Sequence, residues 1–165
     1  MTSEDRSPAL LPFYDQALRF LEFRARSVAE MRRKLLQKGA GASEIEDVID
    51  RLCEQKLLDD GDFARQFARA KLSGPGVSRL RVKQELSRRG VARDIADRAI
   101  QELEDEEGID PATAVQRVAE KKWKSLAKLD AFTRKRRLYA FLARRGFNPD
   151  EIRSAMIALG KELES

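Results

Sequence analysis

The chain of 165 residues contains no histidine, and this absence removes every mechanism that depends on an imidazole. Histidine is the usual general base near neutral pH, the partner of a serine or cysteine nucleophile and a common metal ligand. Only one cysteine, Cys53, is present, so an intrachain disulfide and a cysteine-ligated zinc site are both excluded. Because Cys53 follows the apolar face of a helix, we expect a buried structural thiol rather than a reactive one.

Long apolar runs and glycine-rich phosphate loops are also missing. No apolar run approaches the length of a membrane span, and residues 1–15 lack the basic start and apolar core of a signal peptide. We therefore expect a cytoplasmic protein with no membrane contact. The clustered carboxylates of "LLDDGDF" (57–63) open a helix, where they are expected to cap it rather than hold magnesium. The sequence thus predicts a protein that is not an enzyme and has no cofactor, metal or small-molecule substrate.

The sequence contains one pattern of apolar residues that is repeated three times, around Gly39, Gly90 and Gly146. Apolar residues recur, without a gap, eight and four positions before each glycine and six, nine, ten and thirteen positions after it. These spacings are the apolar faces of two helices, separated by a glycine that ends the first helix in a left-handed turn. The residues are Met31, Leu35, Ile45, Val48, Ile49 and Leu52, then Val82, Leu86, Ala96, Ala99, Ile100 and Leu103, then Leu138, Leu142, Ile152, Ala155, Met156 and Leu159.

A further helix precedes each pair, so each copy is a three-helix module of about 50 residues. Its apolar positions are Phe13, Ala17, Phe20 and Leu21 in the first copy, Phe63, Phe67 and Ala70 in the second, and Val115, Val118, Ala119 and Leu126 in the third. We predict an all-α fold of three tandem three-helix repeats, about nine helices, in an elongated and curved array. The expected boundaries are a tail over 1–9 and repeats over 10–56, 57–108 and 109–162. Because one module has little core, we expect the modules to stack on one another.

Capping signals support these boundaries. "SVAE" (27–30) and "SEIE" (43–46) have the serine–glutamate spacing of capping boxes. Asp110 and Asn148 each stand before a proline, at the expected start of a helix. Thr133 is the expected cap of the second helix in the third repeat, and "SGPG" (73–76) breaks the chain before the second helix of the second repeat.

Charge is segregated along the chain, whose net charge is +5. Residues 112–147 carry eleven basic and two acidic side chains, and residues 79–93 carry six basic and one acidic. Acidic residues collect elsewhere, with eight against two bases in 41–62 and six against none in 102–110. This segregation predicts an elongated surface with a basic side that neutralises phosphates or meets an acidic partner.

Fourteen basic residues form the candidate binding surface for DNA or for a filament that contains it. They are Arg79, Arg81, Lys83, Arg88, Arg89, Lys121, Lys122, Lys124, Arg134, Lys135, Arg136, Arg137, Arg144 and Arg145. The alternative interpretation is a solvated helix face, and a base just before each glycine also complements the helix dipole without any ligand. Helical spacing favours core packing for Trp123, whereas Tyr139 replaces a basic residue of the other repeats and is the better candidate for stacking on a base.

Two tracts resemble the RecX family, the bacterial regulators of the RecA recombinase. "LLDDGDFARQFARAKL" (57–72) followed by "LRVKQELSRRGV" (80–91) is similar to the hallmark of that family, and "ALRFLEFRARSVAEMRRKLLQKG" (17–39) to its opening. The resemblance implies a non-enzymatic modulator built from tandem three-helix repeats. It also implies binding along the groove of the RecA–DNA filament and inhibition of ATP hydrolysis and strand exchange, and so a role in recombination, repair and SOS control.

Two other functions stay open on the residues alone. One is a stand-alone basic helical protein that binds nucleic acid without a recombinase, with a three-helix module acting as the reader. Against it, no second helix presents a clear set of Asn, Gln and Arg side chains for reading bases. The other is a structural adaptor whose basic tract docks an acidic protein.

Overall fold

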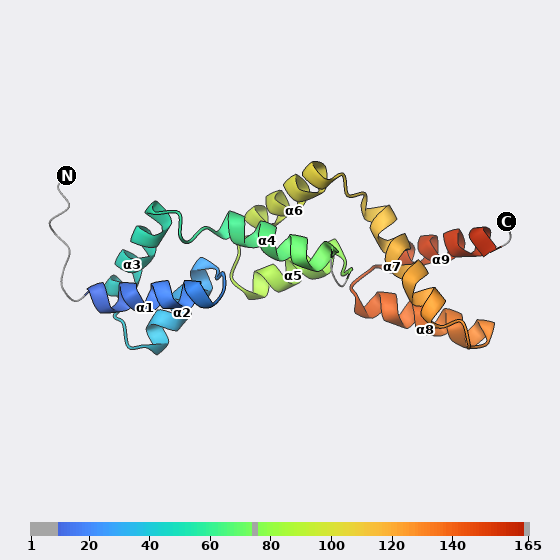
Figure 1. The fold of residues 1–165 in the computed structure, drawn as a ribbon, viewed down its shortest axis with the longest axis horizontal. Helices are drawn as coiled ribbons and strands as arrows, with labels where there is room; N and C mark the ends of the chain where they lie inside the picture. The colour runs from blue at the N-terminus through green and yellow to red at the C-terminus, as the bar shows by residue number, and fades with distance from the viewer. Residues whose placement is uncertain (1–9, 74–75, 164–165) are drawn as a thin grey trace.

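The computed structural model describes residues 10–73 and 76–163, which form nine α-helices and no strand. The expected tail over 1–9 and part of the "SGPG" break lie outside the described residues. The helices are α1 (Leu10–Phe23), α2 (Val28–Gln37), α3 (Ala42–Glu54), α4 (Asp60–Ser73), α5 (Arg79–Arg88), α6 (Arg93–Glu107), α7 (Pro111–Ser125), α8 (Ala131–Arg144) and α9 (Pro149–Leu163). The predicted all-α fold of three three-helix repeats is confirmed, and Figure 1 shows the repeats following one another along the long axis.

Most of the predicted helix ends are present. Ser27 caps α2 in a capping box with Glu30, and Asp110 caps α7 directly before the proline at its first position. Asn148 Oδ1 accepts a hydrogen bond from the Glu151 N–H at 2.8 Å at the start of α9. The three landmark glycines all have positive φ, between 80° and 92°, and end the second helix of each repeat as the spacing predicts.

Two predicted caps are wrong by a few residues. α3 begins at Ala42, and the box at its start is made by Gly41 N–H, which donates to Glu44 Oε2 at 2.7 Å, rather than by Ser43. α8 is capped by Asp130, which accepts from the Thr133 N–H at 2.9 Å, so Thr133 is a partner of the cap and not the cap itself. Both helices thus begin earlier than predicted: α8 at the carboxylate of Asp130, and α3 at Gly41, which has no side chain and whose backbone N–H is bound by Glu44.

Each repeat has its own hydrophobic core, so the premise that one module has little core is wrong. One cluster is centred on Met31, Leu35 and Leu52, a second on Val82, Leu86 and Leu103, and a third on Leu138, Leu142 and Leu159. These are the core positions that the repeat pattern predicts. In the second repeat α4 buries Phe63 and packs Phe67 against the core, as predicted. Ala70 is exposed, contrary to the prediction, and Ala64, Ala68 and Leu72 are buried as well.

The second helices of the three repeats form one row, which we call the second-helix row: α8, then α5, then α2, joined end to end (Figure 1). The turn that ends α5 meets the start of α2, where Ser27 Oγ donates to the Arg89 carbonyl and a Cβ on Gly90 would overlap Ala29. Each C-terminal carbonyl end therefore faces an N-terminal amide end, which aligns the helix dipoles favourably.

A similar contact joins α8 and α5, here made by a backbone N–H. The Ser78 N–H donates to the Arg145 carbonyl at 3.0 Å, and a Cβ on Gly146 would lie 2.8 Å from Arg81 Cβ. Ser27 and Ser78 occupy equivalent places, twelve residues before the landmark glycine, and both are buried. The small serine and the side-chain-free glycine thus allow successive modules to approach closely.

At the α8 end of the row, the third repeat is built differently. α8 starts fifteen residues before its glycine, whereas α2 and α5 start eleven before theirs, so α8 has about one extra turn. Arg134 stands where the other repeats have the serine, and its guanidinium lies 3.7 Å from the centre of the Trp123 ring. The contact that joins two modules is therefore replaced by one within the third module.

Candidate functional site

The candidate surface follows the second-helix row, and the contact between α5 and α2 carries a partly buried ion pair. Arg89 Nη1 lies 3.0 Å from Glu30 Oε1, and Arg24 pairs with the other Glu30 oxygen at 3.0 Å. Partial burial alone would raise the pKa of Glu30, but hydrogen bonds from Arg24 and from the Ser27 N–H, with the positive charge of Arg89, lower it overall. One of the predicted binding residues, Arg89, thus stabilises the first junction.

The second junction has the opposite electrostatic character. Arg81 occupies the place of Glu30, nine residues before the glycine, and Arg145 occupies the place of Arg89. Arg81 turns to Glu85 of its own helix at 3.3 Å, and the Arg145 guanidinium lies 4.9 Å from the centre of the Phe141 ring. The two positions that pair across the first junction are therefore both arginines at the second.

Seven of the fourteen predicted binding residues are partly buried and contact other groups of the chain: Arg79, Arg81, Lys83, Arg89, Lys122, Arg134 and Arg145. Three ion pairs in the second repeat join Arg79 to Glu104 (2.8 Å), Arg81 to Glu85 (3.3 Å) and Lys83 to Asp97 (2.8 Å). In the third repeat Lys122 lies 4.8 Å from the centre of the Phe141 ring, and Arg134 donates to the Trp123 carbonyl at 2.6 Å. These seven side chains therefore stabilise the fold through contacts within the protein.

The other seven are exposed, and we call them the exposed cations: Arg88, Lys121, Lys124, Lys135, Arg136, Arg137 and Arg144. Over the described residues none of them has a carboxylate within ion-pair distance. Five lie on the second-helix row, and two lie on α7 beside it. Arg33 of α2 is also exposed on the same row, and it is not among the fourteen predicted residues. Its signal was the run "RRK" at 32–34.

The acidic third helices neutralise the cations of the first two helices. Beside the pairs above, Glu106 and Glu107 of α6 pair with Arg65 and Arg69 of α4 at 2.8 and 2.7 Å. A hydrogen bond from Lys83 lowers the pKa of Asp97. Burial raises the pKa of Glu104, although the charges of Arg79 and Lys83 oppose the rise. Three acids of the segment over 102–110, Glu104, Glu106 and Glu107, therefore neutralise cations inside the second repeat.

The carboxylates of "LLDDGDF" cap helices, as the sequence analysis expects. Asp59 Oδ1 accepts from the Asp62 N–H at 3.0 Å, and Asp60 Oδ1 accepts from the Val28 N–H at 2.8 Å, at the start of α2. Across the described ranges, no group of three or more His, Cys, Asp or Glu side chains is placed to hold a metal ion. Within the same ranges no helix combines the length and the apolar character that crossing a bilayer requires.

Three single residues complete the comparison. Trp123 packs against the third core cluster, as its spacing predicts, and Tyr139 is 43% exposed.

Cys53 is exposed, so the prediction of a buried thiol is wrong. It comes one position after Leu52, the last buried residue of α3, and so points away from the core. Partial desolvation and the nearby carboxylates of Asp50, Asp59 and Asp60 raise the pKa of Cys53. The thiol is therefore less often a thiolate near neutral pH.

The Glu30 pair gives a pH-dependent prediction. At pH 7, Glu30→Gln should lower the free energy of unfolding by about 1–2 kcal/mol. The substitution removes the charge that caps α2 and breaks the ion pairs of Glu30 with Arg24 and Arg89. The folded-state pKa of Glu30 is depressed, so this contribution is complete above the unfolded pKa of about 4.3 and is lost as the pH falls through the folded value. Urea unfolding of both proteins at pH 7 and pH 2.5 measures the difference.

A matched control is Glu46→Gln, which removes an exposed carboxylate from the pair with Arg32. Exposed pairs stabilise little, so this change should leave unfolding almost unaltered at both pH values. A loss for Glu30→Gln that is the same at pH 2.5 as at pH 7 would contradict the assignment of the effect to the Glu30 charge.

The repeats match a known family domain by domain. Family models for the first, second and third three-helix domains of RecX match residues 14–52, 59–100 and 110–156. The regulatory protein RecX of Pelodictyon phaeoclathratiforme is 36% identical over 154 residues, covering 93% of this chain and 91% of the relative. The regulatory protein RecX of Mycobacterium leprae is 31% identical over 166 residues, covering 96% and 94%.

Solved structures agree on the fold. The crystal structure of RecX from Lactobacillus salivarius superposes with a TM-score of 0.76 at 21% identity, covering 92% of this chain and 96% of that one. A second RecX crystal structure gives a TM-score of 0.69 at 19% identity, covering 86% and 68%. The match of all three domain models, in order, with relatives above 30% identity over nearly the whole length, confirms the resemblance seen in the sequence. The chain belongs to the RecX family of regulatory proteins.

Proposed function

We propose that this protein binds the filament that RecA forms on DNA and inhibits its ATP hydrolysis and strand exchange, without catalysing a reaction itself. Membership of a family of regulatory proteins supports the class of function. The observation that carries the proposal is the second-helix row, which joins three modules end to end and presents exposed cations on successive modules. Such a row suits a target that is itself long and periodic.

The physical argument is one of several weak contacts acting together. A filament repeats one protein subunit and one stretch of DNA phosphate, so modules joined in series can contact successive subunits at the same time. Once one module is bound, the next binds at a high effective concentration, and weak contacts add to a strong one. A protein that bridges neighbouring recombinase subunits in this way restrains the subunit movements that hydrolysis and strand exchange require.

The exposed cations favour contact with phosphate or with acidic protein over reading of bases. They are arginines and lysines on exposed helix faces, and phosphate contacts position a protein without specifying sequence. The same surface would also suit a stand-alone nucleic-acid-binding protein or an adaptor for an acidic protein, and the following experiment distinguishes these two functions from the proposed one.

The test is a titration of the protein into RecA assembled on circular single-stranded DNA, with ATP turnover as the readout. We expect turnover to fall severalfold as the filament becomes saturated, and saturation is measured separately by co-sedimentation. Unchanged turnover on a saturated filament would defeat the inhibitory function. Tight binding to bare DNA with a steep salt dependence, unaffected by recombinase, would favour the stand-alone alternative. Retention of RecA after nuclease treatment would favour the adaptor.

A further inference from the structure

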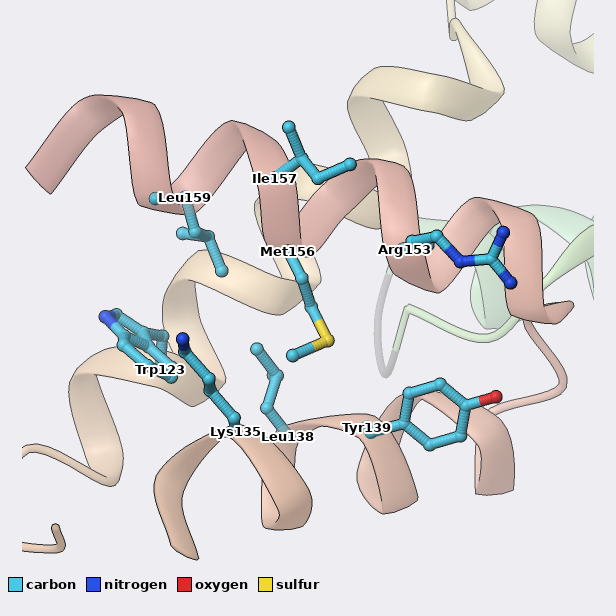
Figure 2. Close-up of a pocket in the computed structure, with 9 residues that line it drawn as sticks. Trp123, Lys135, Leu138, Tyr139, Arg153, Met156, Ile157 and Leu159 are labelled. Atoms are coloured by element: carbon cyan, nitrogen blue, oxygen red, sulfur yellow. The ribbon is translucent and has the colours of Figure 1, made fainter. Parts of the chain in front are cut away.

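A groove of about 540 Å³ opens between α8 and α9 in the third repeat. It is lined by Trp123, Lys135, Leu138, Tyr139, Arg153, Met156, Ile157, Leu159 and Gly160. Figure 2 shows Met156 of α9 reaching toward Leu138 of α8 across its middle. Trp123 and Lys135 lie at one end of the groove, and Tyr139 and Arg153 lie at the other. The walls are thus mainly apolar, and a cation stands at each end.

In the first two repeats, an ion pair joins the second and third helices at the place where the third repeat has this groove. Seven residues before and after the landmark glycine stand Arg32 and Glu46, at 2.6 Å, and Lys83 and Asp97, at 2.8 Å. Each pair bridges the second and third helices of its repeat. In the third repeat the two positions hold Tyr139 and Arg153, so the base is lost from one helix and the acid is replaced by a base on the other.

A second bridge of the middle repeat is also lost. Arg79 and Glu104 pair at 2.8 Å across α5 and α6, eleven residues before and fourteen after the glycine. The third repeat has Lys135 and Gly160 at these positions, so the base remains while the carboxylate and its whole side chain are gone. A Cβ on Gly160 would have no atom within 4 Å, which shows that the space is open.

We propose that this groove binds a short acidic segment of a partner protein that inserts a bulky apolar side chain between α8 and α9. The position next to the core residue Met156 shows the same change of character: it is Asp50 in the first repeat, Gln101 in the second and Ile157, 54% exposed, in the third. Unlike its counterparts, the third repeat therefore offers apolar surface to a partner.

Charge complementarity selects an acidic partner. Lys135 and Arg153 keep or gain positive charge where the matching carboxylates of the middle repeat are absent, and no carboxylate lines the groove over the described residues. Arg153 lies 3.5 Å from Asp150 of its own helix, in a pair that is mostly exposed and so contributes little. Carboxylates on either side of the inserted apolar residue would reach the two cations at the groove ends.

The lining favours a protein segment over a nucleic acid. A base needs a flat aromatic face with polar groups at its edge. The walls here include aliphatic side chains of Leu138, Met156 and Leu159, and Trp123 already has the Arg134 guanidinium over its ring. Trp123 Nε1 is buried and has no hydrogen-bond acceptor among the described residues. A buried indole N–H usually has such an acceptor.

This inference goes beyond the proposed function and does not depend on it, because the groove can be tested without recombinase or DNA. Trp123 is the only tryptophan of the chain, so its fluorescence reports on the groove directly. The probe is a twelve-residue peptide without tryptophan, with two leucines at helical spacing flanked by glutamates. A second peptide has lysines in place of the glutamates, and a single-stranded oligothymidylate tests the rival ligand.

We expect the glutamate peptide to change the Trp123 emission saturably and to bind at least tenfold more tightly than the lysine peptide. Gly160→Glu should weaken this binding at least tenfold, because it restores a carboxylate opposite Lys135 and fills the groove as Glu104 fills the middle repeat. The double substitution Tyr139→Lys with Arg153→Asp introduces the ion pair that Lys83 and Asp97 form in the second repeat, and it should also weaken binding at least tenfold. Ser154→Glu adds the same charge to α9 outside the groove and should leave binding unchanged.

Three results would overturn the inference. One is no change of emission with the glutamate peptide up to millimolar concentration. Another is equal binding of the two peptides, or equal binding by Gly160→Glu and Ser154→Glu. The last is a response to the oligothymidylate that exceeds the peptide response and is lost in Gly160→Glu, which would assign the groove to nucleic acid. A single thermal transition for each variant, close to that of the parent, shows that it is folded.

Discussion

Replacing Arg136, Arg137 and Arg144 together by alanine should weaken binding to the RecA–DNA filament by roughly 100-fold at low salt, if these side chains contact phosphate. All three are exposed members of the second-helix row without an ion-pair partner in the described part of the chain. Each phosphate contact contributes about 0.7–0.9 to the slope of log affinity against log salt concentration. The triple variant should therefore lose about 2–3 of that slope.

The measurement is filament binding by fluorescence anisotropy, with labelled single-stranded DNA carrying RecA, from 50 to 300 mM salt. The control variant replaces Arg19, Arg98 and Lys128, which are also exposed but lie outside the row. It removes the same net charge, so an effect of overall charge would appear equally in both variants. Equal affinity of the two variants would remove the row from the binding site.

The choice of residues for this test depends on the tertiary structure. The sequence treats "RKRR" (134–137) as one run, but Arg134 lies against Trp123 and donates to its carbonyl at 2.6 Å. Removing Arg134 would alter the packing of α8 on α7 as well as the charge. The exposed cations can be replaced with little effect on folding, because solvated charges without partners contribute little to stability.

Gly90→Ala should disrupt the junction between the first two repeats, and it is the largest stability effect that we expect from adding one methyl group. Gly90 has φ +80°, which costs an alanine about 1–2 kcal/mol. The added Cβ would also overlap Ala29, and overpacking of this kind costs about 1–3 kcal/mol more. The overlap can be relieved only if α2 and α5 move apart, which breaks the Ser27–Arg89 hydrogen bond.

Gly39→Ala is a closely matched control. Gly39 has φ +90°, and a Cβ there would have no atom within 4 Å, so only the backbone strain applies. Thermal unfolding of the two variants isolates the contribution of the junction as the difference between them. Small-angle scattering should show a larger radius of gyration for Gly90→Ala alone. Equal losses in both variants, with unchanged scattering, would mean that the junction does not hold the repeats together.

The three repeats and most of their core positions could be predicted, because they depend on short-range periodicity. A helix face is defined by side chains three and four residues apart, and a glycine that ends a helix acts on its own neighbours. The serine–glutamate box at Ser27 was visible for the same reason. At the starts of α3 and α8 the spacing predicted the wrong residue, because both helices begin two or three residues earlier than the predicted cap.

The division of the basic residues could not be predicted, because it depends on which residues of distant segments meet. Arg79 and Lys83 find acids on α6, and Arg89 finds Glu30 some sixty residues earlier in the chain. Their sequence neighbour Arg88 remains exposed. Nothing in a run of arginines distinguishes these cases, since the faces of one helix pack against different parts of the fold.

By itself, the sequence determined the all-α class, the three copies of the module, the core positions and the family, because all of these are written in local spacings. Only the tertiary structure decided that each module has its own core, that α8, α5 and α2 join end to end, and which cations remain free. It also decided that the third repeat opens a groove where the others close an ion pair. The physical reason is that a helix fixes its own faces, whereas the partner of each face is chosen by packing between segments far apart in the chain.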